Sequence, residues 1–252
     1  GMDQWRDESP YTDVKGKNPF KDKRVRQALY QAIDIEAIRR ATMRGLAVPT
    51  GSMLAPQVNG YFEEFAKRLP YDENAARKLL ADAGYPEGFE VTLDCPNNRY
   101  INDEEICIAL SAMWAQLKVK VKVNAMPRVT YFPKLDKNDT SMYMLGWGGS
   151  ITDAEPSITP LMKTADASKG QGAFNYGRVS NPKIDQTGGQ SSVEADPKKR
   201  EALVKATLLE WKEQVHTIPL HRQMIPWAMR SNVSVTHRAD NYLTVEWITI
   251  GR

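Results

Sequence analysis

Histidine and cysteine, the residues that most often bind metals, are scarce in this chain: there are three histidines and two cysteines among 252 residues. His216, His221 and His237 are too few and too scattered for a zinc site unless carboxylates contribute. The two cysteines do not form a metal motif either. We therefore expect no metal and no cofactor, with the histidines at the surface or at strand ends.

Long apolar runs and a strong net charge are also missing. The apolar stretches are short and interrupted by charged residues, so the sequence predicts no transmembrane helix. The net charge of +3 gives no reason to expect nucleic-acid binding, which normally needs a strongly basic face. Residues 1–10 carry no apolar segment typical of a secretory signal, and Gly1 ahead of Met2 resembles a cloning remnant.

Familiar catalytic motifs are absent as well. There is no Gly-x-Ser-x-Gly elbow, no P-loop and no dinucleotide fingerprint after a strand, and the glycine-rich "GWGGS" (146–150) lacks a phosphate-loop lysine. Asp153 and Glu155 could supply paired carboxylates near Tyr143, so a hydrolase is kept as an alternative. The sequence favours a protein that is not an enzyme.

The chain does contain a well-marked strand, helix and strand. Residues 89–95 and 119–125 alternate apolar and polar side chains, as half-buried strands do. Residues 103–117 have the apolar spacing of a helix, and Asn102 with Glu105 forms a capping-box-like start. Strand, helix and strand in this order indicate a parallel pair with a right-handed crossover.

Other helices and loops complete the pattern. Asp72 and Gly84 bracket one helix, and Asp196 with Pro197 starts a long helix that ends near His216. The stretch 164–195 is poor in large apolar residues and rich in Gly, Ser, Asn and Asp. We expect this stretch to lie over the surface.

The two cysteines flank a turn-prone segment. Cys95 ends the first strand and Cys107 lies about one turn into the helix, so a disulfide is geometrically possible. In an exported protein this bond would contribute about 2–3 kcal/mol, whereas in a cytosolic protein both residues would be buried thiols. The segment between them holds Arg99 among polar residues.

An ordered set of segments resembles a known family. These segments are "NPFKDKRVRQALYQAIDIEAI" (18–38), "YDENAARKLLADAGYPEGFEVTL" (71–93), "AQLKVKVKV" (115–123), "GW" (146–147), "NYGRVSNPKID" (175–185) and "IPLHR" (218–222). The set is similar to the C-terminal part of family 5 extracellular solute-binding proteins, the peptide, dipeptide and nickel receptors of ABC importers. It spans about Asn18 to Val235.

The resemblance implies both a fold and a setting. The fold would be an α/β lobe of the periplasmic-binding-protein type, with a mixed, mainly parallel sheet flanked by helices, as in the C-terminal lobe of a two-lobe type II receptor. Residues 1–17 would be an extension, 18–235 the ligand-binding lobe, and 236–252 a segment returning towards a missing N-terminal lobe. The implied partners are a small-molecule or peptide-like ligand and a membrane permease, and the implied location is the periplasm.

The resemblance also implies site residues. Arg99 matches the arginine that pairs with the ligand carboxylate in the dipeptide receptors of this family. The aspartate that pairs there with the ligand's ammonium group is replaced by Ser150, and Asp153 or Glu155 is a more distant substitute. Since a neutral hydroxyl supplies no counter-charge for a buried ammonium, we expect an anionic solute such as a sugar acid, an opine-like conjugate or a modified peptide.

Further contacts are expected around Arg99. Trp147 is placed at the cleft face, where an indole can cover an apolar part of a ligand, with a core tryptophan as the alternative. Asn98, Tyr100 and Asn175 are expected to add polar groups. A chaperone-like module that binds extended chains is the remaining alternative function.

Overall fold

The strand–helix–strand unit forms the centre of the fold. β2 (Glu90–Pro96) and β3 (Lys120–Met126) pair in parallel, and α5 (Asp103–Ala115) connects them. β4 (Met142–Tyr143) pairs in parallel with the other edge of β2, which gives the strand order β3-β2-β4. The expected parallel pair is confirmed.

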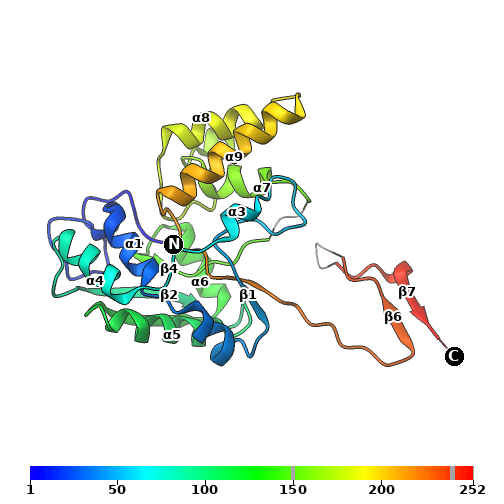
Figure 1. Cartoon of the computed structure of the whole chain (residues 1–252), viewed down its shortest axis with the longest axis horizontal. Coiled ribbons are helices and arrows are strands. Elements are labelled where there is room, and N and C mark those ends of the chain that lie inside the picture. The colour runs from blue at the N-terminus through cyan, green and yellow to red at the C-terminus, as the bar shows by residue number, and fades with distance from the viewer. Residues whose placement is uncertain (149–150, 239–241, 252) are drawn as a thin grey trace.

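The computed structural model describes residues 1–148, 151–238 and 242–251, and none of the helices in these ranges is long and apolar enough to cross a bilayer. α5 and α6 (Arg128–Asp136) lie against the sheet, whereas α8 (Pro182–Ser191) and α9 (Pro197–Glu213) pack side by side away from it (Figure 1). The other α-helices are α1 (Lys23–Gln31), α2 (Ile35–Ala37), α3 (Glu63–Ala66), α4 (Glu73–Asp82) and α7 (Glu155–Ser157). The remaining strands are β1 (Ala47–Pro49), β5 (His221–Gln223), β6 (Val233–Val235) and β7 (Ile248–Ile250).

The first residues of the chain join the sheet in the opposite direction. Met2 is buried and forms an antiparallel bridge with Met142, and the backbone N–H of Asp3 donates to the carbonyl of Ser141 at 2.8 Å. The sheet is therefore mixed and mainly parallel, as expected. The start of the stretch 1–17, expected as an extension, packs on the body.

Two large hydrophobic clusters hold the body together, and a smaller third one lies around Tyr131 and Tyr143. One lies between the sheet and α1, α4 and α5, and the other beneath α8 and α9. Fully burying one large aliphatic side chain contributes about 1.5–3 kcal/mol, so each cluster is a substantial core. The first includes Val25, Leu29, Leu80, Leu93, Ile106, Leu110 and Trp114. The second includes Leu54, Phe65, Ile158, Met162, Ile184, Val204 and Trp211.

Helix α8 lies within the stretch 164–195, where the sequence indicated surface segments without naming a helix. The Asn181 side chain accepts the N–H of Lys183 and so caps its first turn. Inside the helix, a β-carbon at Gly188 would lie only 2.9 Å from the Cγ2 of Ile158. This glycine therefore permits close packing against a neighbouring turn, whereas in the sequence it looked like a loop residue.

The end of α9 depends on a buried arginine. Val215 has a φ of 51°, a left-handed conformation that is rare for a β-branched residue. The buried Arg26 side chain donates to the carbonyls of Val215 and Gln214, and to two further carbonyls just before α1. Burial lowers the pKa of Arg26 to about 10. These bonds fix the turn that leads from α9 towards β5.

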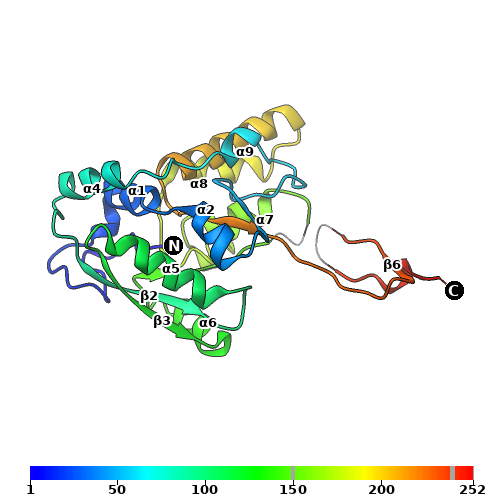
Figure 2. The same ribbon diagram turned by 60° about the horizontal axis from the view of Figure 1, so that its bottom comes forward.

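The C-terminal residues leave the body as a two-stranded ribbon. After Gln223 the chain extends away, and β6 then pairs with β7 in antiparallel fashion (Figures 1 and 2). Residue 236, where the returning segment is expected to begin, directly follows β6. Exposed apolar side chains line the departing part: Met224, Ile225, Met229, Tyr242, Leu243, Val245, Trp247 and Ile250.

Replacing Arg26 tests its role at the α9 turn. We expect Arg26→Met to lower the free energy of unfolding by about 3 kcal/mol or more, because several buried carbonyls lose their donor. Urea unfolding followed by circular dichroism measures this. Arg39→Met is the control, since Arg39 is exposed and forms a surface ion pair with Glu36, and it should cost less than about 1 kcal/mol. Equal losses in both variants would contradict the prediction.

Candidate functional site

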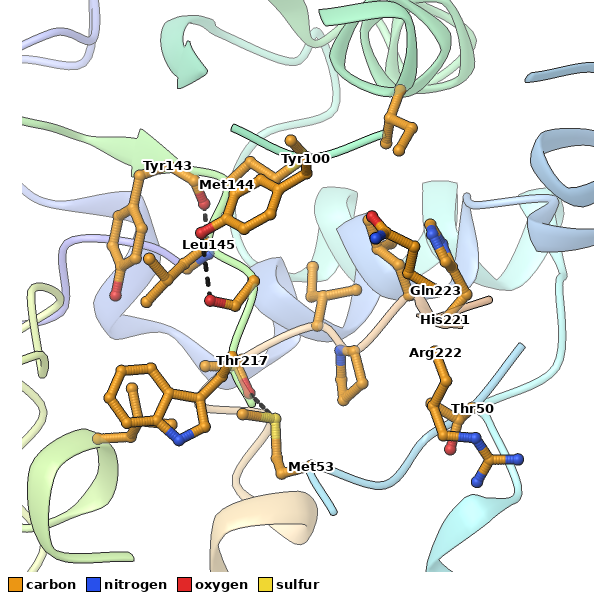
Figure 3. Close-up of a pocket in the computed structure, with 18 of the residues that line it drawn as sticks. Thr50, Met53, Tyr100, Tyr143, Met144, Leu145, Thr217, His221, Arg222 and Gln223 are labelled. Carbon is orange, nitrogen blue, oxygen red and sulfur yellow. Dashed lines mark hydrogen bonds between the residues drawn. The ribbon is translucent and has the colours of Figure 1, made fainter. Parts of the chain in front are cut away.

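A cavity of about 520 Å³ opens between the two hydrophobic clusters. Four segments contribute much of its lining: 52–55, 99–101, 142–148 and 216–223. Figure 3 shows Tyr100 and Leu145 on one side and His221 and Gln223 on the other. The volume lies in the range of about 300–1,000 Å³ that is typical of small-molecule sites.

The sheet brings two of these segments together. The loop with Arg99 follows β2, and the segment with Trp147 follows β4. Because β2 and β4 are parallel neighbours, both segments emerge at the same carboxyl edge of the sheet. This edge is where ligands usually bind in open α/β sheets.

A disulfide closes the Arg99 loop at its base. Cys95 in β2 is bonded to Cys107 in α5, and both residues are fully buried. The sulfur of Cys107 also lies 3.8 Å from the sulfur of Met144, which leads from β4 towards Trp147. The bond that the sequence left open is present, and it fixes the start of α5 against the end of β2.

The turn from this loop into α5 differs from the expected capping box. Asn102 has a left-handed φ of 54°, and its side-chain amide donates to the carbonyl of Thr42 at 2.7 Å. Asp103 is buried, and one of its carboxylate oxygens accepts the N–H groups of Arg99 and Tyr100 at 2.9 Å each. The capping box at Asn102 was a wrong prediction, because the left-handed turn directs this side chain away from the helix.

Arg99 is exposed at the cavity, and its guanidinium carbon lies 5.0 Å from the ring centre of Tyr100. The Tyr100 hydroxyl donates to the carbonyl of Gly146 at 3.2 Å, and burial raises the pKa of Tyr100. A β-carbon at Gly146 would lie 2.5 Å from the tyrosine ring, so only glycine allows this contact. In the part of the chain that the structure describes, the Arg99 guanidinium forms no ion pair.

Trp147 is half-buried at the wall of the cavity. Its indole N–H donates to the carbonyl of Pro156 at 3.2 Å, and its ring lies 5.0 Å from that of Phe174. The ring also packs on the second hydrophobic cluster. Trp147 therefore lines the cavity and also makes core contacts.

Asn98 and Asp153 do not line the cavity, because their side chains bond to other parts of the chain. The Asn98 side chain accepts the N–H of Arg128 at 2.8 Å, at the start of α6. Asp153 pairs with Arg200 at 2.8 Å. Burial is the largest single influence on Asp153 and raises its pKa, but the hydrogen bond and charge of Arg200, together with backbone N–H bonds, outweigh it, so the pKa is lowered. Asp153 is thus already neutralised by a partner within the chain.

Asn175 borders the cavity, but its amide group is bonded within the wall. It donates to the carbonyls of Lys163 and Val179, and it accepts the N–H of Val179. A side chain that is buried and bonded in this way holds a turn in place. Ser150 lies outside the described residues.

The cavity lining has basic side chains but, among the described residues, no aspartate or glutamate. The basic groups are Arg99, Arg222, His216 and His221. Burial lowers the pKa of His221, with a further contribution from Arg68. The two arginines are therefore the groups that give this wall its positive charge at neutral pH.

His216 is buried, which the expectation of surface or strand-end histidines missed. One ring nitrogen donates to the Gln4 side chain at 3.0 Å, and the other accepts from Asn181 at 3.3 Å. Burial is the main cause that lowers the pKa of His216 to about 4. This histidine is neutral in the folded protein at neutral pH.

The sequence did not indicate that Arg222 and Gln223 line the cavity. Both lie in β5, and the Gln223 side chain accepts the N–H of Ile101 at 3.1 Å, which ties the Arg99 loop to this strand. The stretch 217–235 predicts two short strands broken by prolines, and β5 lies within it. It gave no sign that the strand borders the Arg99 loop.

The chain belongs to the bacterial extracellular solute-binding proteins, family 5, whose middle-region model matches residues 8–169. The glutathione-binding protein GsiB of Escherichia coli (strain K12) is 29% identical over 203 residues, which is 78% of this chain and 39% of that protein. GsiB of Salmonella typhimurium is 28% identical over 203 residues, again 78% of this chain and 39% of that protein. The chain therefore spans about two fifths of the length of these relatives, which are solute-binding proteins rather than enzymes.

Solved structures show the same fold. DppA from Helicobacter pylori, in complex with the peptide STSA, superposes with a TM-score of 0.79 at 19% identity, covering 96% of this chain and 47% of that one. A dipeptide-binding protein from Pseudoalteromonas sp. SM9913, in complex with Met-Leu, superposes with a TM-score of 0.79 at 22% identity. The match covers 93% of this chain and 46% of that protein. The periplasmic-binding-protein fold expected from the sequence is confirmed.

The disulfide should be detectable by mass and by stability. Without reductant, the intact chain should be about 2 Da lighter than the reduced chain, and reduction should lower the free energy of unfolding by about 2–3 kcal/mol. Mass spectrometry and urea unfolding measure the two effects. In Cys95→Ala/Cys107→Ala, stability should not respond to reductant. A response of equal size in this variant would show that the effect lies elsewhere.

His216 should make stability depend on pH. Its pKa is about 4 when folded and near 6.5 when unfolded, so the unfolded state binds more protons between these values. Stability should therefore fall as the pH drops from 6.5 to 4, by on the order of 3 kcal/mol. Urea unfolding at several pH values, compared with His216→Gln, isolates this contribution. Parallel curves for the two proteins would contradict it.

Proposed function

We propose that this chain is one lobe of the substrate-binding receptor of an ABC importer, and that it contributes one wall of a cleft for a small anionic, peptide-like ligand. The observation that carries this proposal is the cavity: its described lining contains Arg99 and Arg222 but no carboxylate. An anion gains ion pairing at such a wall, whereas a cation would be buried without a counter-charge.

Arg99 is the proposed anchor for a ligand carboxylate. Its planar guanidinium can bind a carboxylate in bidentate fashion, and one such charged hydrogen bond contributes roughly 1.5–3 kcal/mol. Tyr100 flanks Arg99, and Trp147 offers an apolar surface for the rest of the ligand. Ser150 is proposed as a neutral contact to the ligand. Asn98 and Asn175 are bonded within the chain and are proposed to stabilise the start of α6 and a turn of the cavity wall.

The ligand class follows from which charges are free. Asp153, the nearest substitute for an ammonium partner, is already paired with Arg200. This lobe therefore favours a ligand whose charge is mainly negative, such as a sugar acid, an opine-like conjugate or a modified peptide. The glutathione-binding relatives fit this class, because glutathione is a small peptide with a net negative charge.

The rest of the receptor would come from a second lobe. The chain spans 39% of its relatives' length, and the exposed apolar side chains beyond Gln223 suit the segment 236–252 to packing on that lobe. We infer export to the periplasm, an oxidising compartment in which the Cys95–Cys107 disulfide is stable. A membrane permease would receive the ligand.

The proposal is tested by restoring the missing lobe and measuring glutathione binding by calorimetry. We expect Arg99→Ala to weaken binding by about tenfold or more, because the carboxylate loses its charged partner. Arg39→Ala is the matched control, since Arg39 is exposed and is not one of the residues that line the cavity. Unchanged affinity in Arg99→Ala would remove Arg99 from the site, and tight binding by the present chain alone would contradict the two-lobe cleft.

A further inference from the structure

We propose that Asp103 is the positioning residue of Arg99, holding its backbone so that the guanidinium is presented to the ligand. This inference rests on the proposed function, since it assigns a role within the same site. Asp103 is 3% exposed, and one carboxylate oxygen accepts both the Arg99 and the Tyr100 N–H groups. Its other oxygen accepts the N–H of Glu104 at 3.1 Å.

These bonds fix the loop at the residue that matters for binding. Hydrogen bonds to a carboxylate are roughly twice as strong as those between neutral groups. Two of them fall on consecutive residues, so they set the direction in which the exposed Arg99 side chain leaves the loop. A loop ordered in advance loses less entropy when the ligand binds, and affinity rises accordingly.

Asp103 is itself held in place by the disulfide. Asp103 and Cys107 are four residues apart, so they share one face of α5. The bond from Cys107 to Cys95 attaches that face to the end of β2. A continuous path therefore runs from the sheet through the disulfide and the first turn of α5 to the backbone of Arg99.

The electrostatic effect of Asp103 opposes its positioning effect. A buried negative charge near the cavity repels an anionic ligand, so removing the charge alone should not weaken binding. Removing the acceptor oxygens should weaken it. Asp103→Asn and Asp103→Ala separate the two effects, because asparagine keeps an oxygen that can accept from both N–H groups.

The deciding experiment is a double-mutant cycle with Arg99→Ala in the two-lobe protein, using glutathione as the probe. With Arg99 present, Asp103→Ala should lower affinity about tenfold and Asp103→Asn by less than about threefold; with Arg99→Ala, both should change it less than about twofold. Asp72→Ala is the matched control, since Asp72 likewise accepts a backbone N–H, at 2.8 Å, at the start of α4. An equal loss from Asp103→Ala in both backgrounds overturns the proposal.

Amide hydrogen exchange in the present chain keeps this test separate from that of the proposed function. Asp103→Ala should speed exchange at Arg99 and Tyr100 by about tenfold while Leu110 in α5 is unchanged. Unchanged exchange at Arg99 and Tyr100, or equal acceleration along all of α5, overturns the positioning role. If the two-lobe protein fails to bind glutathione while the exchange result holds, the failure lies with the proposed ligand and not with Asp103.

Discussion

The parallel pairing of β2 with β3 and β4 is the constraint on which the rest of this structure depends. It places the ends of β2 and β4 at one edge of the sheet, so that the loop with Arg99 and the segment with Trp147 face a common space. The disulfide and the contact between Cys107 and Met144 also hold α5 against this edge of the sheet. The candidate site is thus a direct outcome of strand direction.

Many polar groups of the cavity lining bond to other parts of the chain. Asn175 holds a turn and His216 joins two segments, whereas Asp153, which pairs with Arg200, lies outside the lining. Side chains bonded in this way stabilise the cavity walls. If they bound a ligand instead, these internal hydrogen bonds would be lost. Among the described residues the exposed guanidinium of Arg99 forms no ion pair, so it is a group that a ligand can engage.

The sequence predicted the elements whose signals are local. Alternation at 119–125 and the start of the long helix at Asp196 both appear in the structure, and the fold class followed from the family resemblance. The misses depended on tertiary contacts. The left-handed turn at Asn102 is tied to a carbonyl far along the chain, and the glycine inside α8 serves close packing with another turn. The burial of His216 and the closeness of β5 to Arg99 arise only when distant segments meet.

The C-terminal ribbon has a consequence for how the chain behaves in solution. Among the described residues, β6 and β7 pair with each other and with no other strand, so their outer edges offer backbone groups to which another strand could bond. Trp247 and Ile250 add exposed apolar surface beside those edges. Concentration-dependent self-association of the isolated chain would therefore begin at the ribbon, whose residues lie outside the hydrophobic clusters of the body.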